Sequence, residues 1–167
     1  AIERGRYAQA FPAFGAERRG APVVAFTRIG DRPIKRRCQV LRPAFLIIQD
    51  QALLGVQGVT HGLNEAGAIL VNTTKDPAPI SEETGVPVVA LPATPLANEI
   101  LGRPVPNTAL LAAFLSLTGL IPVEALVQSL SHRFTGKVLE KNTQLIEAAV
   151  DHVAAGQWEE IARATGS

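Results

Sequence analysis

Residues 68–72 read Ala-Ile-Leu-Val-Asn, a compact apolar run. Two similar runs lie on either side of it in the chain, Ala44-Phe-Leu-Ile-Ile-Gln49 and Val86-Pro-Val-Val-Ala-Leu91. Helix-like segments follow two of these runs, at 51–54 and 91–101. Continuous apolar strands separated by helical segments are typical of a sheet that is covered on both faces. We therefore predict an α/β layered sandwich with a mostly parallel or mixed sheet covered by helices.

Further strands are expected before residue 44. Residues 22–29 are rich in β-branched and aromatic side chains and stop at the turn pair Gly30-Asp31. Residues 34–40 are interrupted by basic side chains and are compatible with a short edge strand.

The last third of the chain is expected to be helical. Residues 108–118 are apolar around much of a helix, and apolar residues between 123 and 134 recur at three- and four-residue spacing. Residues 137–153 continue with one apolar face, and 156–167 form a short helix that docks on the domain or on a neighbour. Since no repeat or low-complexity linker is present, we predict one domain over residues 1–167.

Composition excludes several classes of function. The formal net charge is +1, which gives no bulk argument for nucleic acid or an anionic membrane surface. Cys38 is the only cysteine, so this chain alone cannot hold a disulfide, a cysteine-ligated cluster or a zinc–thiolate site. The three histidines are far apart, and no metal site is expected. A reducing, cytoplasmic setting fits best.

The chain shows neither a secretory signal nor a membrane span. Residues 1–6 lack an apolar core, and the longest apolar run, Ala109 to Leu115, is far shorter than a bilayer. A soluble protein is expected. Because the chain does not open with Met, we expect it to begin after the natural start.

The densest candidate for a ligand contact is the run Phe11 to Pro22, whose composition is that of a loop. Gly15 and Gly20 flank the pair Arg18-Arg19. Glycines let the backbone approach a ligand closely, while guanidinium groups bind phosphate or carboxylate oxygens. The alternative is a solvated turn with two surface arginines, and the residues alone favour it.

Other polar positions give weaker indications. Gly55 to Gly62 lacks the spacing of a nucleotide-binding loop and is expected to be a turn between helix and strand. No serine lies in the context of a hydrolase nucleophile, so no catalytic residue is assigned. Asn107 is expected to be a helix N-cap. Asn142 lies in line with Val138 and Leu145, so its amide needs a backbone or ligand partner.

Four blocks of the chain resemble the gamma subunits of 2-oxoacid:ferredoxin oxidoreductases, the pyruvate:ferredoxin oxidoreductase family. The first is Tyr7 to Arg28, YAQAFPAFGAERRGAPVVAFTR. The others follow in the same order as in the family: Gly67 to Thr73; Leu101 to Thr108 with Leu111 to Phe114; and Thr118 to Ile121 with Arg133 to Lys137 and Glu140 to Asn142. One feature departs from the family pattern: the usual first strand with its Gly-x-Gly-Gly-Gln-Gly loop is absent, and residues 1–6 resemble the end of the helix that follows it.

The resemblance implies an accessory gamma subunit of a complex that oxidatively decarboxylates a 2-oxoacid, pyruvate by default, with coenzyme A to acyl-CoA and carbon dioxide. Electrons would pass to ferredoxin or to an NAD-linked acceptor. Thiamine diphosphate, Mg2+ and 4Fe–4S clusters would lie on the alpha, beta and delta-type subunits. Enzymes for aryl-glyoxylates such as phenylglyoxylate, for 2-oxoglutarate or for branched-chain 2-oxoacids remain alternatives, as does a purely structural subunit without ligand contact.

The resemblance also suggests which residues contact coenzyme A or another subunit. The residues expected to contact coenzyme A are Gly15, Arg18, Arg19, Gly20 and Asn142. The residues expected at subunit interfaces are Tyr7, Phe11, Phe14, Glu17 and Trp158. Neither a catalytic residue nor a metal ligand is expected on this chain.

Overall fold

A computed structural model describes residues 5–13 and 23–165 of the chain. They belong to two compact units, residues 1–42 and 43–167, which are described separately. None of the helices in the described ranges is both long enough and apolar enough to cross a lipid bilayer.

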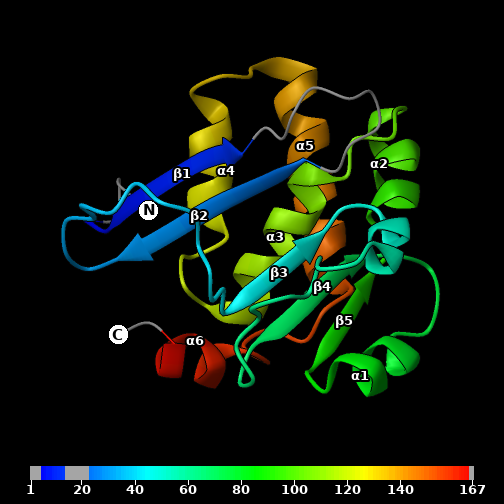
Figure 1. Cartoon of the computed structure of the whole chain (residues 1–167). Helices are drawn as coiled ribbons and strands as arrows, with labels where there is room; N and C mark the ends of the chain where they lie inside the picture. The colour runs from blue at the N-terminus through cyan, green and yellow to red at the C-terminus, as the bar shows by residue number, and fades with distance from the viewer. Residues whose placement is uncertain (1–4, 14–22, 166–167) are drawn as a thin grey trace. The chain divides into compact units, whose positions relative to one another are not determined.

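The second unit is built on a three-stranded parallel sheet (Figure 1). Its strands are β3 (Phe45–Ile48), β4 (Ala68–Asn72) and β5 (Val88–Leu91), and they lie in the order β3-β4-β5. The central strand β4 is buried on both faces, which explains its uninterrupted apolar sequence. The predicted α/β class with a mostly parallel sheet is confirmed.

Helical segments surround this sheet and fill the last third of the chain, as expected. Their bounds are η2 Gln51–Gly55, α1 Ala78–Thr84, α2 Ala93–Leu101, α3 Asn107–Thr118, α4 Glu124–Ser131, α5 Gly136–Asp151 and α6 Glu159–Thr165. Asn107 is the first residue of α3, and Pro106 occupies the cap position, so the prediction that Asn107 is an N-cap is wrong. Proline suits a helix start because it has no backbone N–H to leave unpaired.

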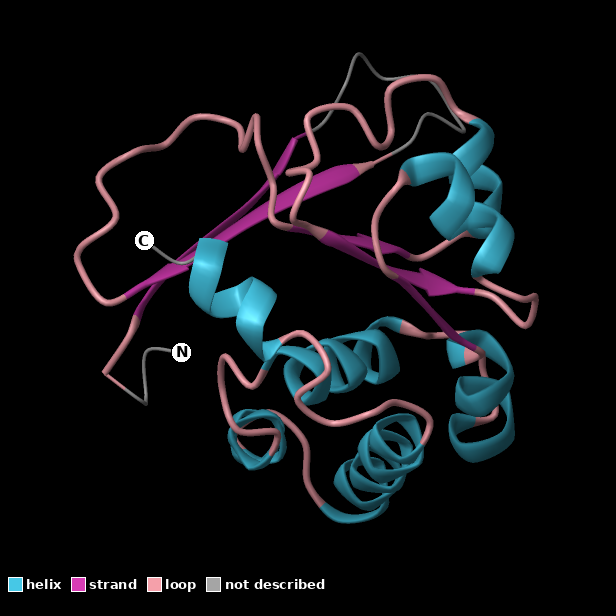
Figure 2. Cartoon of the chain, turned by 90° about the horizontal axis from the view of Figure 1, so that it is seen from below, coloured by secondary structure: helices cyan, strands magenta, loops and turns pink. Residues whose placement is uncertain are grey.

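The two faces of the sheet carry separate apolar clusters. On one face, alternate residues such as Leu70 and Leu91 pack against α2, α3 and α5. On the other face, Ile69 and Val71 pack against η2, α1 and the turns between residues 56 and 64. Figure 2 shows helical segments on either side of these strands. The period of two in a strand is what divides one apolar sequence between two layers.

The C-terminal segment packs against its own unit. The backbone N–H of Trp158 donates to the Leu117 carbonyl at 2.8 Å, and its ring stacks on Phe45 with centroids 5.8 Å apart. The side chain of Trp158 is 1% exposed. Of the two alternatives for this segment, docking on the domain is therefore the one observed.

The first unit contains a two-stranded antiparallel sheet. Strand β1 (Tyr7–Ala13) pairs with β2 (Val24–Gly30), and Phe11 lies opposite Phe26 with ring centroids 5.6 Å apart. Strand β2 confirms the expected strand at 22–29. Phe11 to Ala13 were expected in a loop but belong to β1, and the rest of that expected loop, up to residue 22, lies outside the described residues. An isolated pair of strands tolerates Pro12, since one edge of each strand carries no ladder hydrogen bonds.

Residues 31–42 form neither a helix nor a strand. The edge strand that the sequence suggested at 34–40 is therefore wrong. Three successive cationic side chains, Lys35, Arg36 and Arg37, break the alternation of apolar and polar residues that a half-buried strand needs.

Candidate ligand crevice

An open crevice of about 500 Å³ lies at the carboxyl edge of the three-stranded sheet. In open parallel sheets this edge is the usual place for a ligand, because the loops that follow the strands converge there. The crevice is lined by the loops after β3 and β4, the start of α2 and the prolines before α3. These residues are Gln49, Asp50, Gln51, Asn72, Thr73, Thr74, Thr94, Pro95, Pro104 and Pro106.

Asn72, the last residue of β4, joins the elements around the crevice. Its Nδ2 group donates to the backbone carbonyl of Gln49 at 2.9 Å and to Oγ1 of Thr94 at 2.7 Å. Its Oδ1 accepts from the backbone N–H of Thr94 at 3.1 Å. Because Pro92 at the cap of α2 offers no side-chain hydrogen bond, Asn72 supplies the missing acceptor at that helix start.

Thr73 fixes the next part of the rim. Its hydroxyl donates to Oε1 of Gln51 at 2.6 Å and accepts from the backbone N–H of Lys75 at 3.1 Å. Its own backbone N–H donates to the Leu91 carbonyl at the end of β5. The Asn-Thr pair that ends β4 thus positions the loops after all three strands.

The chemistry of the lining is polar but almost uncharged. Amide and hydroxyl groups alternate with proline rings, and the one ionisable side chain among the lining residues is Asp50. An oxygen of Asp50 already accepts from the backbone N–H of Ala52 at 2.9 Å. Such a surface fits a neutral ligand or ligand part that carries amide groups and apolar carbons. With no lysine or arginine in the lining, it is poorly suited to phosphate.

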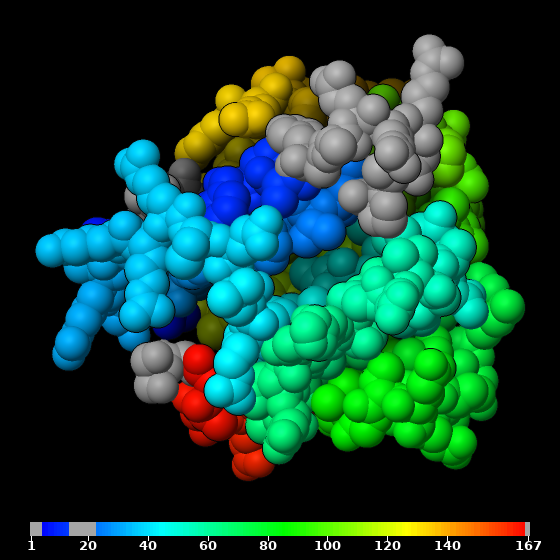
Figure 3. Space-filling view, in the orientation of Figure 1, coloured from blue at the N-terminus to red at the C-terminus, as the bar shows by residue number. Residues whose placement is uncertain are grey.

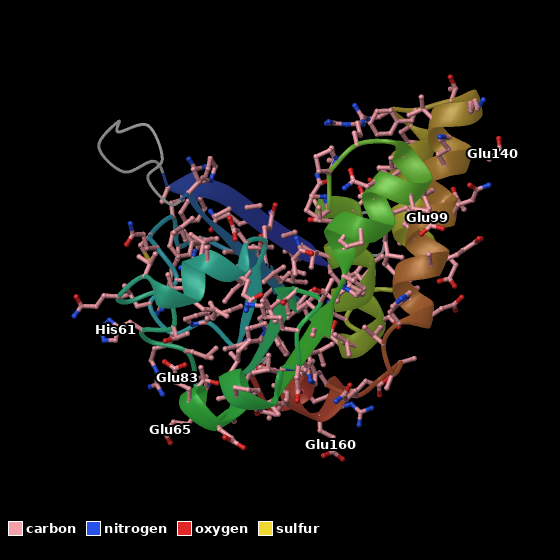
Figure 4. All side chains as sticks on the ribbon, turned by 90° about the vertical axis from the view of Figure 1, so that its right-hand side faces the viewer. His61, Glu65, Glu83, Glu99, Glu140 and Glu160 are labelled. Carbon is pink, nitrogen blue, oxygen red and sulfur yellow. The ribbon has the colours of Figure 1, made fainter. Side chains whose placement is uncertain are left out.

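A second hollow of about 280 Å³ involves Leu63, Glu65, Ile80 and Glu83 among its lining residues. Figure 4 shows the side chains of His61, Glu65 and Glu83 on one side of the ribbon, directed away from its core. No group of three histidine, cysteine, aspartate or glutamate side chains in the described ranges is placed to hold a metal ion.

Most of the expected site residues are not placed by the structure. Gly15, Arg18, Arg19 and Gly20 lie outside the described residues, as do Phe14 and Glu17. Tyr7 and Phe11 lie in β1, where Tyr7 is exposed and Phe11 is half-buried. A role for these two residues at a subunit interface stays a prediction.

Asn142 lies on α5 and is buried. Its Nδ2 group donates to the backbone carbonyl of Val138, one turn earlier in the same helix, at 2.8 Å. Of the two possible partners for its amide, a backbone group is the one observed. A contact between Asn142 and coenzyme A stays a prediction. The ring of Trp158 is buried within its own unit, and its role at a subunit interface stays a prediction.

The crevice itself was not expected from the sequence. In the sequence, Asn72 is only the last residue of the apolar run 68–72, within the block Gly67 to Thr73 that resembles the family. The available indication was an Asn-Thr pair placed directly after a fully apolar strand. That pattern shows where a strand ends, but it does not show which loops meet there.

Known protein families were compared with the sequence of this chain. The family model described as pyruvate ferredoxin/flavodoxin oxidoreductase matches residues 1–152. The chain belongs to this family. The family expected from the four sequence blocks is thereby confirmed.

Gamma-type subunits are among the most similar relatives. Pyruvate synthase subunit PorC of Methanothermobacter thermautotrophicus is 42% identical over 153 residues, which are 92% of this chain and 83% of the relative. The pyruvate/ketoisovalerate oxidoreductases common subunit gamma of Thermococcus kodakarensis is 41% identical over 152 residues, covering 89% and 82% of the two chains.

A solved structure shares the fold. The crystal structure of pyruvate oxidoreductase subunit PORC from Thermotoga maritima superposes with a TM-score of 0.80 at 34% identity, covering 93% of this chain and 84% of that one. The chain is thus a gamma-type member of the family by both sequence and fold.

Proposed function

We propose that this chain is the accessory gamma subunit of a complex that oxidatively decarboxylates a 2-oxoacid with coenzyme A, giving acyl-CoA and carbon dioxide. The observation that carries the proposal is the family match over residues 1–152, together with relatives named as subunits of pyruvate synthase. In this proposal residues 1–167 act as one gamma-type domain in a cytoplasmic complex. Thiamine diphosphate, Mg2+ and 4Fe–4S clusters are held by the alpha, beta and delta-type subunits.

Pyruvate is the proposed substrate because the name pyruvate synthase recurs among the relatives. A second candidate is a branched-chain 2-oxoacid, because the Thermococcus relative is named as a subunit common to pyruvate and ketoisovalerate enzymes. The purified complex should be assayed with pyruvate, 3-methyl-2-oxobutanoate, 2-oxoglutarate and phenylglyoxylate, each with ferredoxin and with NAD as acceptor. A kcat/KM that is highest for an acid other than pyruvate would refute the first choice.

We further propose that the crevice at the carboxyl edge of the sheet helps to enclose coenzyme A. The pantetheine arm of the coenzyme carries amide groups and a branched apolar carbon, which match the amides, hydroxyls and proline rings of the lining. The phosphates of the coenzyme would need cationic groups other than the described lining residues, which include no lysine or arginine.

The crevice hypothesis can be tested by filling it. Thr74 is exposed on the lining, and its side chain forms no hydrogen bond within the described residues, so Thr74→Trp should obstruct the crevice without unfolding the unit. We expect the apparent KM for coenzyme A to rise about tenfold, equal to about 1.4 kcal/mol of binding, while the KM for pyruvate is unchanged. Glu140→Trp, on the exposed side of α5 (Figure 4), is the matched control. Equal constants in the two variants would refute the hypothesis.

The pair Arg18-Arg19 is a separate candidate, for a phosphate of coenzyme A or for an acidic residue of the alpha subunit. Replacing both arginines with alanine separates these targets. An unchanged KM for coenzyme A in an intact complex would exclude the phosphate contact, and loss of assembly would support the interface. If neither this variant nor Thr74→Trp altered the KM for coenzyme A, a purely structural subunit would be the better description.

A further inference from the structure

The net charge of the chain conceals an uneven distribution. Residues 1–42 hold ten of the 16 lysines and arginines but only three of the 15 acidic residues. Residues 43–167 hold the remaining six basic and 12 acidic residues. The near-neutral total is therefore the sum of a strongly cationic first unit and an anionic second unit. Such asymmetry indicates a surface for an anionic partner.

The cationic charge is concentrated in residues 32–42, here named the basic segment. Five of its eleven residues are basic and all five are exposed: Arg32, Lys35, Arg36, Arg37 and Arg42. None of these five side chains forms an ion pair with another described residue of its own unit. Their charges are therefore not neutralised within the described part of that unit. Figure 3 shows this light-blue part of the chain spread over the surface of its unit.

The basic segment is held in place by Arg28 of β2. One guanidinium nitrogen of Arg28 donates to the backbone carbonyl of Gln39 at 3.0 Å. Another donates to Oε1 of Gln9 at 3.4 Å, and the guanidinium carbon lies 6.0 Å from the centroid of the Phe11 ring. Although the segment has no regular secondary structure, it is thus attached to the two-stranded sheet through Gln39. A partly fixed segment loses less conformational entropy on binding than a free one.

The composition of the segment favours a protein surface over a nucleic acid or a single phosphate group. No aromatic residue lies between Ile29 and Arg42, so stacking on bases has no support. The cations are distributed along the chain, and none of them lines either of the two hollows described above. Leu41 lies among them and is 78% exposed, which provides an apolar contact within a charged surround. Arginines around an apolar contact are typical of protein interfaces.

We propose that the basic segment is a docking surface for an acidic surface on a companion subunit of the oxidoreductase complex. This inference rests on the proposed function, because it requires that companion subunits exist. It assigns an electrostatic contact to residues 32–42, outside the Tyr7 to Arg28 stretch in which the expected ligand contacts of this unit lie.

A zero-length carbodiimide, which joins an amine to a carboxylate in close contact, offers a direct test. Lys35 is the one lysine within residues 1–42, so a cross-link from this unit through a lysine identifies the basic segment. We expect the purified complex to give a peptide that joins Lys35 to an aspartate or glutamate of a companion subunit. The matched control, Lys35→Arg, should abolish that peptide and leave assembly unchanged, because it keeps the charge but removes the reactive amine.

Charge reversal supplies an independent measurement. Arg36→Glu with Arg37→Glu should release the gamma chain from the complex at a lower salt concentration, as followed by native mass spectrometry at stepped ionic strength. Arg133→Glu with Lys137→Glu, two exposed cations of the second unit, makes the same change in net charge and should have no such effect.

The inference is overturned if Lys35 in the intact complex cross-links only within its own chain or not at all. It is also overturned if the two charge-reversal pairs release the gamma chain at the same salt concentration. An electrostatic contact between subunits should be weakened by salt, so suppression of the cross-link by coenzyme A, and not by salt, would overturn the inference as well. In those cases the proposed function stands. If the chain purifies without companion subunits, the proposed function fails, and this inference fails with it.

Discussion

The side chain of Asn72 caps helix α2 through Thr94: its Oδ1 accepts from the Thr94 backbone N–H at 3.1 Å and its Nδ2 donates to Oγ1 of the same residue at 2.7 Å. A residue at the end of β4 thus performs a task that usually belongs to the residue before a helix. The arrangement places the start of α2 against the end of β4. It therefore helps to set the width of the crevice between them.

Replacing Asn72 with alanine should destabilise the second unit by about 2–3 kcal/mol, because it removes the cap of α2 and leaves the Gln49 carbonyl without this donor. Urea unfolding of the purified chain would measure the change. Asn72→Asp keeps an acceptor for the Thr94 N–H but loses both donated bonds, so it should have an intermediate stability. If Asn72→Ala were as stable as the unmodified chain, the role of Asn72 as a cap would be refuted.

Gly67→Ala should destabilise the chain by about 2 kcal/mol or more, because a Cβ atom there would overlap the backbone and force it to move. An ideal Cβ would lie 2.6 Å from the Ala44 carbonyl oxygen and 2.7 Å from that of Asn64. Gly55→Ala is the matched control, since a Cβ at Gly55 meets nothing within 4 Å. Thermal unfolding of both variants should show a lower Tm for Gly67→Ala alone. Equal Tm values would contradict the packing.

Trp158→Ala should destabilise the second unit by about 3–5 kcal/mol, because it opens a cavity beside Phe45. Trp158→Phe should have a smaller effect. It keeps a ring in the stack and removes an indole N–H that is buried without a hydrogen-bond partner. Urea unfolding followed by circular dichroism would measure both variants, and equal losses of stability would contradict this view.

Arg28→Ala should loosen the basic segment, because the hydrogen bond to the Gln39 carbonyl holds the segment to β2. Trypsin should then cleave at residues 32–42 several times faster, since proteolysis follows local opening. Limited digestion read by mass spectrometry would locate the cuts. Arg163→Ala, which breaks only an exposed ion pair with Glu159 on α6, is the control. Unchanged cleavage in Arg28→Ala would show that the segment is held by other contacts.

The elements of the second unit were largely predictable. Strand β4 is apolar on both sides because both faces of the sheet are covered, and that pattern shows in the residues themselves. The helices α4 and α5 follow from the spacing of their apolar residues in the same way. Strand β1 was not predicted, because it contains a proline and runs into a glycine-rich stretch, so that its residues have the composition of a loop. Its pairing partner β2 also lies beyond residue 22.

The polar residues show where sequence reasoning stopped. The sequence predicts that the amide of Asn142 has a hydrogen-bond partner. It does not show whether that partner is a backbone group of the helix or a ligand. The structure shows the backbone partner: Nδ2 of Asn142 lies 2.8 Å from the carbonyl oxygen of Val138, one turn earlier in the helix. Trp158 was expected in a segment that docks either on the domain or on a neighbour, and the structure buries its ring within its own unit.

The sequence by itself determined the family and the α/β class, because both depend on the order and period of residues along the chain. The tertiary structure alone brought Gln49, Asn72 and Thr94 together, since the carboxyl ends of parallel strands meet only once the strands have paired. It also showed that the cations of residues 32–42 are exposed and have no ionic partner among the described residues of their unit, which a net charge of +1 conceals. The spacing of apolar residues is a local property of a chain. The proximity of two side chains and their exposure to solvent follow from the packing of segments that are distant in the sequence.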